Sequence, residues 1–206
     1  MLIFDDVFVR RAGRGLFRPV TFALQPGEIM TLQGESGLGK STLLHALIDQ
    51  EPGVEFMGQI ILDGHQMDAN ARLSTESQTV FQEPLLFPHL SIGANIELSM
   101  HQFAGVARKV RADQLLDQLG LQGMATKDPF QLSRGQMMRV AVARALAPHP
   151  RVLLLDEPLS ALDTETREQV KQVIYEQVRH DGGYGILVTH HPEDRPIGGD
   201  MMCLTR

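Results

Sequence analysis

Residues 34–42 read Gly34-Glu35-Ser36-Gly37-Leu38-Gly39-Lys40-Ser41-Thr42. The first eight fit the pattern G-x-x-x-x-G-K-[ST], in which glycines let consecutive backbone N–H groups point into one concavity and bind phosphate oxygens. An apolar run, Glu28–Gln33, precedes the loop, and Ser41–Asp49 follows it with helical spacing, so that a helix N-terminus would face the anion. We therefore expect all nine residues to bind the phosphates of a nucleotide, with Lys40 reaching the β- and γ-phosphates and Ser41 offering a hydroxyl to Mg²⁺.

Short apolar runs elsewhere indicate the strands of an α/β sheet. Besides the run before the loop, the expected strands are residues 2–9, Val20–Leu24, Gln59–Leu62, Val152–Leu155 and Ile186–Val188. Turns are expected at Pro26-Gly27 and Asp63-Gly64. Residues 91–147 have mostly helical spacing, with Gly120 as a cap after one of the helices. This order predicts an α/β fold with a helix-rich lobe inserted in it.

Two acidic residues, Asp156 and Glu157, follow the run Val152–Leu155. Open α/β sheets bind ligands at the carboxyl ends of their strands, so we expect Asp156 beside the phosphate loop. Its carboxylate would bind Mg²⁺ directly or through water, whereas Glu157 would point elsewhere and polarise the attacking water. The alternative is a strand that ends in a solvated acidic turn, and the phosphate loop favours the metal site over that alternative.

Composition and charge limit the class of protein. The chain has 206 residues, of which 43% are apolar and 21% charged, as expected for one globular domain or one domain with an inserted lobe. The net charge of −6 argues against a broad nucleic-acid-binding face, and the single cysteine favours a reducing compartment. No run approaches the roughly 20 apolar residues of a membrane-spanning helix, and the first residues have no signal-peptide core. We expect a soluble protein that would reach a membrane only by docking on a partner.

Four further segments carry a family resemblance. They are Phe81-Gln82-Glu83, Leu132-Ser133-Arg134-Gly135-Gln136, Ser160-Ala161-Leu162-Asp163 and Val188-Thr189-His190. In that order they resemble the Q-loop, signature, D-loop and switch histidine of the ATP-binding subunits of ABC transporters, and the resemblance covers nearly the whole chain. His191 is adjacent to the switch position, but the register of the match favours His190.

The resemblance implies a fold and a domain plan. The expected fold is a P-loop NTPase core with a mainly parallel sheet, a small antiparallel β subdomain and a helical subdomain inserted at about residues 89–150. Residues 1–206 would form a single ABC ATPase domain without an extra C-terminal regulatory domain. Inhibition through such a domain would then not be available to this chain.

The resemblance also implies the cofactors ATP and Mg²⁺ and a set of site residues. Glu157, His190 and Lys40 would be catalytic, with His190 hydrogen-bonded to the γ-phosphate and positioning water. Ser41, Gln82 and Asp156 would bind the metal. Gln82 would do so through its amide oxygen, and the alternative for it is an ordinary surface glutamine.

In this family two subunits pack head to tail, so the signature of one reaches the nucleotide of the other. Ser133, Gly135 and Gln136 would therefore contact the ATP bound by a second copy, and the N-terminus of the signature helix would add a favourable dipole. Hydrolysis would require this homodimer.

Two positions depart from the family pattern. Arg134 replaces the first glycine of the signature, where its guanidinium would either attract the triphosphate or point outward. The position expected to stack an aromatic ring on adenine is Arg11, which has no Tyr or Trp beside it. We expect the guanidinium plane of Arg11 to cover the base. Phe8 or Phe17 would be the substitute if the local loop were rearranged.

The segment Phe81–Ile92 is the expected contact with a membrane partner. Its apolar residues are Leu85, Leu86, Phe87 and Leu90, which either form an exposed docking surface or cover the chain's own core. The stretch resembles bacterial importers of small ions and metabolites. That resemblance implies transmembrane permease subunits, a periplasmic solute-binding protein and a cytoplasmic position on the inner face of the membrane. The alternatives are a non-transport ABC ATPase acting on ribosomes or DNA, and a P-loop kinase or nucleotide-binding regulator.

Overall fold

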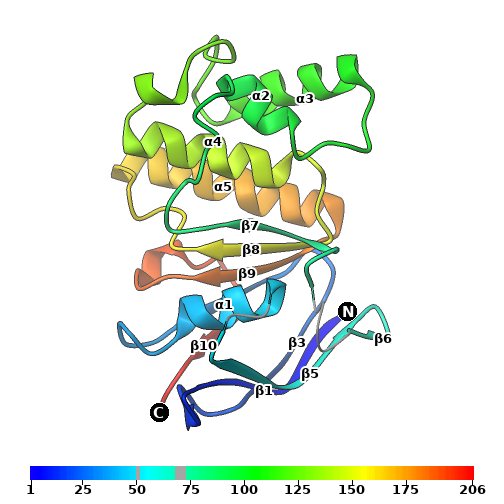
Figure 1. Ribbon diagram of the computed structural model, residues 1–206, viewed down its shortest axis with the longest axis vertical. Helices are drawn as coiled ribbons and strands as arrows, with labels where there is room; N and C mark the ends of the chain where they lie inside the picture. Colours follow the sequence, from blue (N-terminus) through cyan, green and yellow to red (C-terminus); the bar gives the residue numbers. More distant parts are fainter. Residues whose placement is uncertain (50–51, 68–72) are drawn as a thin grey trace.

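The computed structural model describes residues 1–49, 52–67 and 73–206. Its helices are α1 (Lys40–Ile48), α2 (Ile92–Glu97), α3 (Gly105–Gln118), α4 (Arg134–Leu146) and α5 (Thr164–Asp181), with short 3-10 turns at Pro129–Gln131 and Pro192–Asp194. Figure 1 shows the elements in layers. Helices α2 and α3 lie outermost, followed by α4 and α5, a parallel sheet, α1 and finally an antiparallel sheet.

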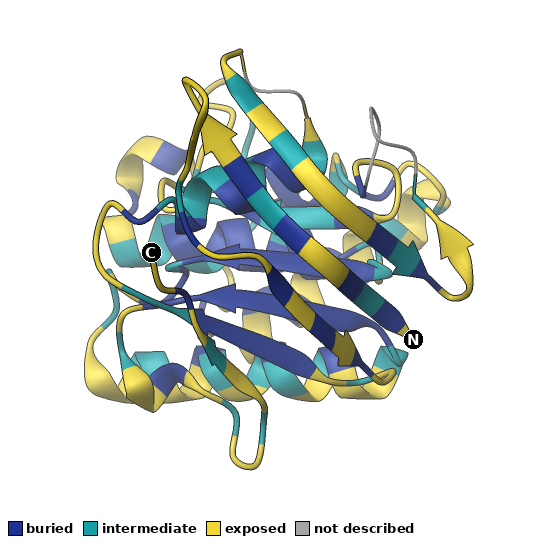
Figure 2. Cartoon of the chain, turned by 90° about the horizontal axis from the view of Figure 1, so that it is seen from below, coloured by how far each residue is buried: buried dark blue, intermediate teal, exposed yellow. Residues whose placement is uncertain are grey.

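The parallel sheet has the strand order β10 (Met201–Cys203), β4 (Ile29–Gln33), β9 (Tyr184–Val188), β8 (Val152–Asp156), β7 (Ser77–Val80). All neighbouring strands are parallel. Every residue of β8 and β9 is buried (Figure 2), because α4 and α5 cover one face of the sheet and α1 with the antiparallel sheet covers the other. The strands point the same way, so the segments that follow β4, β7, β8 and β9 meet at one edge of the sheet.

The antiparallel sheet is built around β1 (Leu2–Arg11), which pairs with β2 (Arg14–Gly15), β3 (Val20–Leu24) and β5 (Val54–Leu62); β5 in turn pairs with β6 (His65–Gln66). In β3, buried and exposed residues alternate, as expected for a sheet with one solvated face. The inner face packs on α1, since Phe4 and Phe22 share one core cluster with Leu43 and Leu47.

A second core cluster fills the other face of the parallel sheet. Met138 of α4, Leu115 of α3 and Ile174 of α5 belong to it together with Leu153 of β8. The chain leaves α3 through Gly120, whose φ of 67° lies in the left-handed region, as expected for the glycine after a helix. These helices lie between β7 and β8 in the sequence, apart from α5, which follows β8.

The expected α/β architecture is confirmed, and each strand predicted from an apolar run is present. Among the described residues, the strands β2, β6, β7 and β10 and the helix α5 have no counterpart among the predictions. Strand β7 reads Ser-Gln-Thr-Val and lacks the apolar run that identifies a buried strand. The helical stretch at 91–147 is divided into α2, α3 and α4 by loops and a 3-10 turn.

A polar cluster joins the two sheets on the side away from the phosphate loop. Asp63, in the turn after β5, accepts hydrogen bonds from Tyr184 Oη (2.6 Å) and Arg151 Nε (2.8 Å). Tyr184 begins β9, and Arg151 directly precedes β8. Hydrogen bonds from the N-terminal ammonium group, Tyr184 and Arg151 hold the pKa of Asp63 well below its usual range. The folded protein therefore stabilises the charged form of the Asp63 side chain.

We expect Asp63→Asn to lower the free energy of unfolding at pH 7 by about 1–2 kcal/mol, since charge-assisted hydrogen bonds are lost at a partly exposed site. A depressed pKa stabilises the fold above the unfolded value near 3.8, and that stabilisation is lost as the pH falls below it. The measurement is the free energy of unfolding in urea at pH 7 and at pH 3. The difference in this free energy between variant and wild type should be smaller at pH 3. Asp113→Asn on α3 is the matched control, and an equal loss in that variant would contradict the role of the cluster.

Candidate functional site

The phosphate loop connects β4 to α1 and has the backbone that close phosphate approach requires. Gly37 and Gly39 have φ values of 76° and 99°, in the left-handed region that favours glycine. A Cβ at Gly39 would lie 2.6 Å from Leu16 Cδ1, so no other residue fits there without movement. Lys40 is 7% exposed, and its Nζ donates to Gly34 O (2.7 Å) and Glu35 O (2.8 Å). Its ammonium group is therefore held over the loop.

Two of the three expected metal ligands are in contact. Ser41 Oγ, in the first turn of α1, donates to Asp156 Oδ1, at the end of β8, over 3.1 Å. Asp156 is 3% exposed, and burial raises its pKa while the hydrogen bond from Ser41 opposes that shift. A hydroxyl and a carboxylate side by side at a phosphate loop are the hard oxygen ligands that Mg²⁺ prefers, so the residues present fit the ion.

Glu157 forms a second pair, next to the first. Its backbone has a φ of 49°, in the left-handed region that is uncommon for residues other than glycine. Glu157 Oε1 lies 3.1 Å from His190 Nδ1, and Gln82 Nε2 donates to Glu157 Oε2 over 3.5 Å. The three side chains follow β8, β9 and β7, so the sheet edge brings together residues up to 108 positions apart in the sequence. Here the amide nitrogen of Gln82 faces Glu157, a contact that the sequence did not predict.

The signature segment caps α4. Ser133 is the N-cap: its Oγ accepts from Gln136 N (3.2 Å), and Ser133 N donates back to Gln136 Oε1 (2.9 Å), which completes a capping box. The sequence predicted a nucleotide contact for Gln136 and missed this local role, although Ser-x-x-Gln is the pattern of such a box. Arg134 is exposed. Within the described residues, no hydrogen bond or ion pair joins Ser133–Gln136 to the phosphate loop of the same chain.

The expected adenine contacts differ in their surroundings. Arg11 ends β1, paired with Arg14 and Val54. Phe17 is only 4% exposed and belongs to the core, so stacking on a base would require it to leave that core. Leu16, which precedes it, packs against the phosphate loop at Gly39, and sequence reasoning did not identify this contact.

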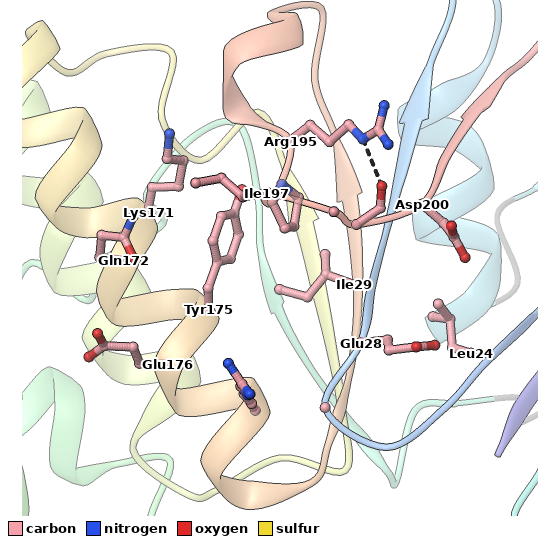
Figure 3. Close-up of a pocket in the computed structure, with 15 residues that line it drawn as sticks. Leu24, Glu28, Ile29, Lys171, Gln172, Tyr175, Glu176, Arg195, Ile197 and Asp200 are labelled. Atoms are coloured by element: carbon pink, nitrogen blue, oxygen red, sulfur yellow. Dashed lines mark hydrogen bonds between the residues drawn. The ribbon is translucent and has the colours of Figure 1, made fainter.

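A cavity of about 420 Å³ lies elsewhere, between α5, the beginning of β4 and the loop at residues 195–200 (Figure 3). Tyr175, Glu176 and Arg195 contribute to its lining together with Ile29 and Asp200. None of the residues predicted to bind nucleotide or metal lines this cavity. The candidate site is the edge of the sheet rather than this cavity.

Comparison with known proteins identifies relatives that align with most of this chain. The chain is 39% identical to the Fe(3+) ions import ATP-binding protein FbpC 2 of Haemophilus influenzae over 90% of this chain and 53% of that protein. It is 39% identical to the spermidine/putrescine import ATP-binding protein PotA of Chromobacterium violaceum over 83% of this chain and 50% of that protein. The chain thus spans about half the length of these curated relatives.

A shorter relative is covered more fully. The aliphatic sulfonates import ATP-binding protein SsuB 1 of Xanthomonas axonopodis pv. citri is 41% identical over 93% of this chain and 75% of that protein. Among solved structures, a dimeric structure of the bacterial ABC transporter cassette MJ0796 is 28% identical, with a TM-score of 0.84, over 100% of this chain and 94% of that chain. A post-hydrolysis dimer of the same cassette, bound to ADP and Pi, has a TM-score of 0.79 at 29% identity and covers 94% of this chain and 90% of that chain.

The family model described as ABC transporter matches residues 17–160, which begin before the phosphate loop and extend beyond Glu157. These residues contain the loop, the Ser41–Asp156 pair and the signature cap. The chain belongs to the ABC transporter family.

Proposed function

We propose that this chain binds ATP and hydrolyses it to ADP and phosphate as the motor subunit of an ABC transporter that imports a small solute. The observation that carries the proposal is the pairing at one sheet edge of Ser41 with Asp156 and of His190 with Glu157, at 3.1 Å in both cases. The Ser41–Asp156 pair is suited to bind a metal ion, and the His190–Glu157 pair is suited to bind the attacking water. His190 follows β9, which is adjacent to β4, the strand that leads into the phosphate loop. Asp156 and Glu157 lie at the end of β8, the next strand in the sheet.

Each side chain of the site would have its own role in hydrolysis. Lys40 and the loop amides bind the phosphates, and Ser41 and Asp156, joined by the amide oxygen of Gln82 after rotation of that side chain, would hold Mg²⁺. The bound ion would neutralise charge that develops on the transferred phosphoryl group. Glu157 would accept a hydrogen bond from the attacking water and polarise it. His190 would orient Glu157 and hydrogen-bond the γ-phosphate.

A homodimer packed head to tail completes this proposed site. Both MJ0796 structures are described as dimeric, which supports the same assembly here. Ser133 and the Gly135 backbone at the start of α4 would reach the ATP of the second copy, where the N-terminal end of the helix favours an anion. A Cβ at Gly135 would lie 3.1 Å from Ala161 O, so this glycine lets α4 approach the segment after Glu157 closely.

The turn at residues 84–90 supports a docking role. Leu85 and Phe87 are 55% and 42% exposed, whereas Leu86 packs against the core and Leu90 is half-buried. The two expectations for these four residues, docking surface and core cover, thus each describe part of the turn. Leu85 has a φ of 43°, an uncommon backbone conformation for a leucine. An exposed apolar pair on a constrained turn is suited to a protein partner.

Two side chains hold this turn in place. Arg144, on the signature helix α4, donates to Leu85 O (2.8 Å) and Pro84 O (3.1 Å). Asn95 is fully buried, accepts from Phe87 N (2.8 Å) and donates to Phe87 O (3.1 Å). The turn is therefore preorganised, which lowers the entropic cost of binding a partner.

The proposed partner is a transmembrane permease, with a periplasmic solute-binding protein in the complete system. No helix within residues 1–49, 52–67 and 73–206 has the length and apolar character needed to cross a bilayer. The chain would act from the cytoplasmic side, bound to its permease at the inner face of the membrane. The import functions named for FbpC, PotA and SsuB support the importer assignment, and the net charge of −6 gives no support to nucleic acid as a partner.

Serine substitution of both exposed residues, Leu85→Ser with Phe87→Ser, is expected to weaken permease binding at least 10-fold, because burying each side chain contributes about 1.5–3 kcal/mol. Co-purification of the chain with a polytopic membrane protein, from cells that express it at native level, measures the effect. ATP hydrolysis by the isolated chain should change less than twofold. Ile197→Ser, at an exposed apolar residue outside the turn, is the control. Wild-type chain that co-purifies with no membrane protein would contradict the transporter assignment.

A further inference from the structure

A network of buried polar groups stabilises the turn that carries His190. Thr189 and Asp194 are 1% and 2% exposed. Thr189 Oγ1 donates to Asp194 Oδ2 (2.7 Å), and the backbone N–H of His191 donates to Thr189 Oγ1 (3.0 Å). Asp194 N also donates to His191 O (3.1 Å), which closes the turn. A buried carboxylate is costly unless it is paired, so the surroundings of Asp194 decide how firmly this turn is held.

Helix α5 supplies the partners from one face. Arg167, Lys171 and Tyr175 are spaced four residues apart and therefore lie in a row, which we call the α5 row. Arg167 Nε lies 3.4 Å from Asp194 Oδ1, Lys171 Nζ donates to Glu193 O (3.1 Å), and Tyr175 Oη donates to Asp194 O. Figure 3 shows Lys171 and Tyr175 projecting from α5 toward this part of the chain. The α5 row therefore contacts residues 193 and 194 at both side-chain and backbone atoms.

Arg167 has a second contact, with the segment that follows Glu157. Its Nε donates to Leu159 O (3.4 Å), two residues after Glu157, and Leu159 is 1% exposed. One guanidinium group therefore touches the segment that follows Glu157 and the turn that follows His190. The two segments meet again where His190 Nδ1 lies 3.1 Å from Glu157 Oε1. Arg167 therefore bridges the same two segments whose side chains form this pair.

We propose that Arg167 is a positioning residue, which acts through Asp194 to hold His190 in register with Glu157 for hydrolysis. The inference rests on the proposed ATPase function of this site. In the part of the chain that the structure describes, no hydrogen bond or ion pair joins Arg167 to the phosphate loop or to the Ser41–Asp156 pair. Arg167 therefore sets the rate of the chemical step rather than the affinity for nucleotide. Small displacements of reacting groups lower rates by about 10²-fold, which sets the scale of the effect.

The test is Arg167→Ala, assayed for ATP hydrolysis over a range of ATP concentrations and for binding of a fluorescent ATP analogue. We expect kcat to fall about 10- to 100-fold while nucleotide affinity stays within twofold of wild type. Arg167→Lys, which keeps a cation near Asp194 but cannot reproduce the guanidinium fork, should recover part of kcat. It also serves as the second variant if Arg167→Ala does not fold. Arg179→Ala, an exposed arginine on the same helix, is the matched control.

A double-mutant cycle with His190→Ala separates positioning from a general structural effect. If Arg167 acts through His190, then adding Arg167→Ala to His190→Ala should lower kcat by less than twofold further. An unchanged kcat in Arg167→Ala, or an equal loss in the presence and absence of His190, would overturn the inference. A wild-type chain that does not hydrolyse ATP would instead contradict the proposed function and remove the premise of the inference.

Discussion

Glu157→Gln is expected to lower ATP hydrolysis by about 10²–10⁴-fold, the usual contribution of a general base, and to leave ATP binding intact. Glutamine has the shape of glutamate and can still accept a hydrogen bond, but its neutral amide cannot take up a proton from water. The hydrogen bond between His190 Nδ1 and Oε1 can persist in the variant, and the Gln82 amide can rotate so that its oxygen accepts from the new amide nitrogen. The measurements are phosphate release and the affinity for ATP.

The same variant should accumulate as an ATP-bound dimer, because the nucleotide that holds two copies together is no longer consumed. Size-exclusion chromatography with ATP and Mg²⁺ should show the dimer, and omission of Mg²⁺ or replacement of ATP by ADP should return the monomer. Glu176→Gln, an exposed glutamate on α5, is the control and should resemble wild type. Normal turnover in Glu157→Gln would exclude Glu157 as the base, and dimer formation without nucleotide would exclude the ATP-dependent assembly.

The phosphate loop could be predicted from the sequence because the residues that determine its structure lie close together in the chain. Residues 34–42 carry their own glycines, their strand and their helix within a short segment, and the structure has the loop between β4 and α1 with Lys40 folded over it. Apolar runs also identified β8 and β9, whose residues are all buried. The rule that ligands bind at the carboxyl ends of parallel strands predicted that Asp156 would lie beside the phosphate loop.

What the sequence could not predict depends on contacts between distant segments. Strand β7 has polar residues and is recognisable only from its pairing with β8. The bridge from Arg167 to Leu159 and Asp194 joins three segments whose proximity no spacing reveals. Leu16 is an ordinary apolar residue in the sequence, and only the folded chain brings it against Gly39. The residue that contacts adenine stays a prediction for the same reason, since it depends on how the loop after β1 meets a nucleotide.

Lys40→Ala is expected to weaken ATP binding by about 100-fold or more and to abolish detectable hydrolysis. The ammonium group is nearly buried, 2.7 and 2.8 Å from two loop carbonyls, and a phosphate oxygen would add a charge-assisted hydrogen bond worth about 1.5–3 kcal/mol. Loss of a positive charge beside several phosphate charges increases the effect beyond one hydrogen bond. Titration with a fluorescent ATP analogue and an assay of phosphate release measure the two consequences.

The difficulty with this variant is that Lys40 also stabilises its own loop, because alanine leaves the carbonyl oxygens of Gly34 and Glu35 without their donor. Thermal unfolding in the absence of nucleotide therefore has to accompany the binding assay. Lys109→Ala on α3, an exposed lysine, controls for the change in net charge. If the unfolding temperature stays near wild type and ATP affinity falls, then the lysine acts on the phosphates. A fully active Lys40→Ala would contradict the assignment of residues 34–42 as the phosphate site, and with it the proposed ATPase function.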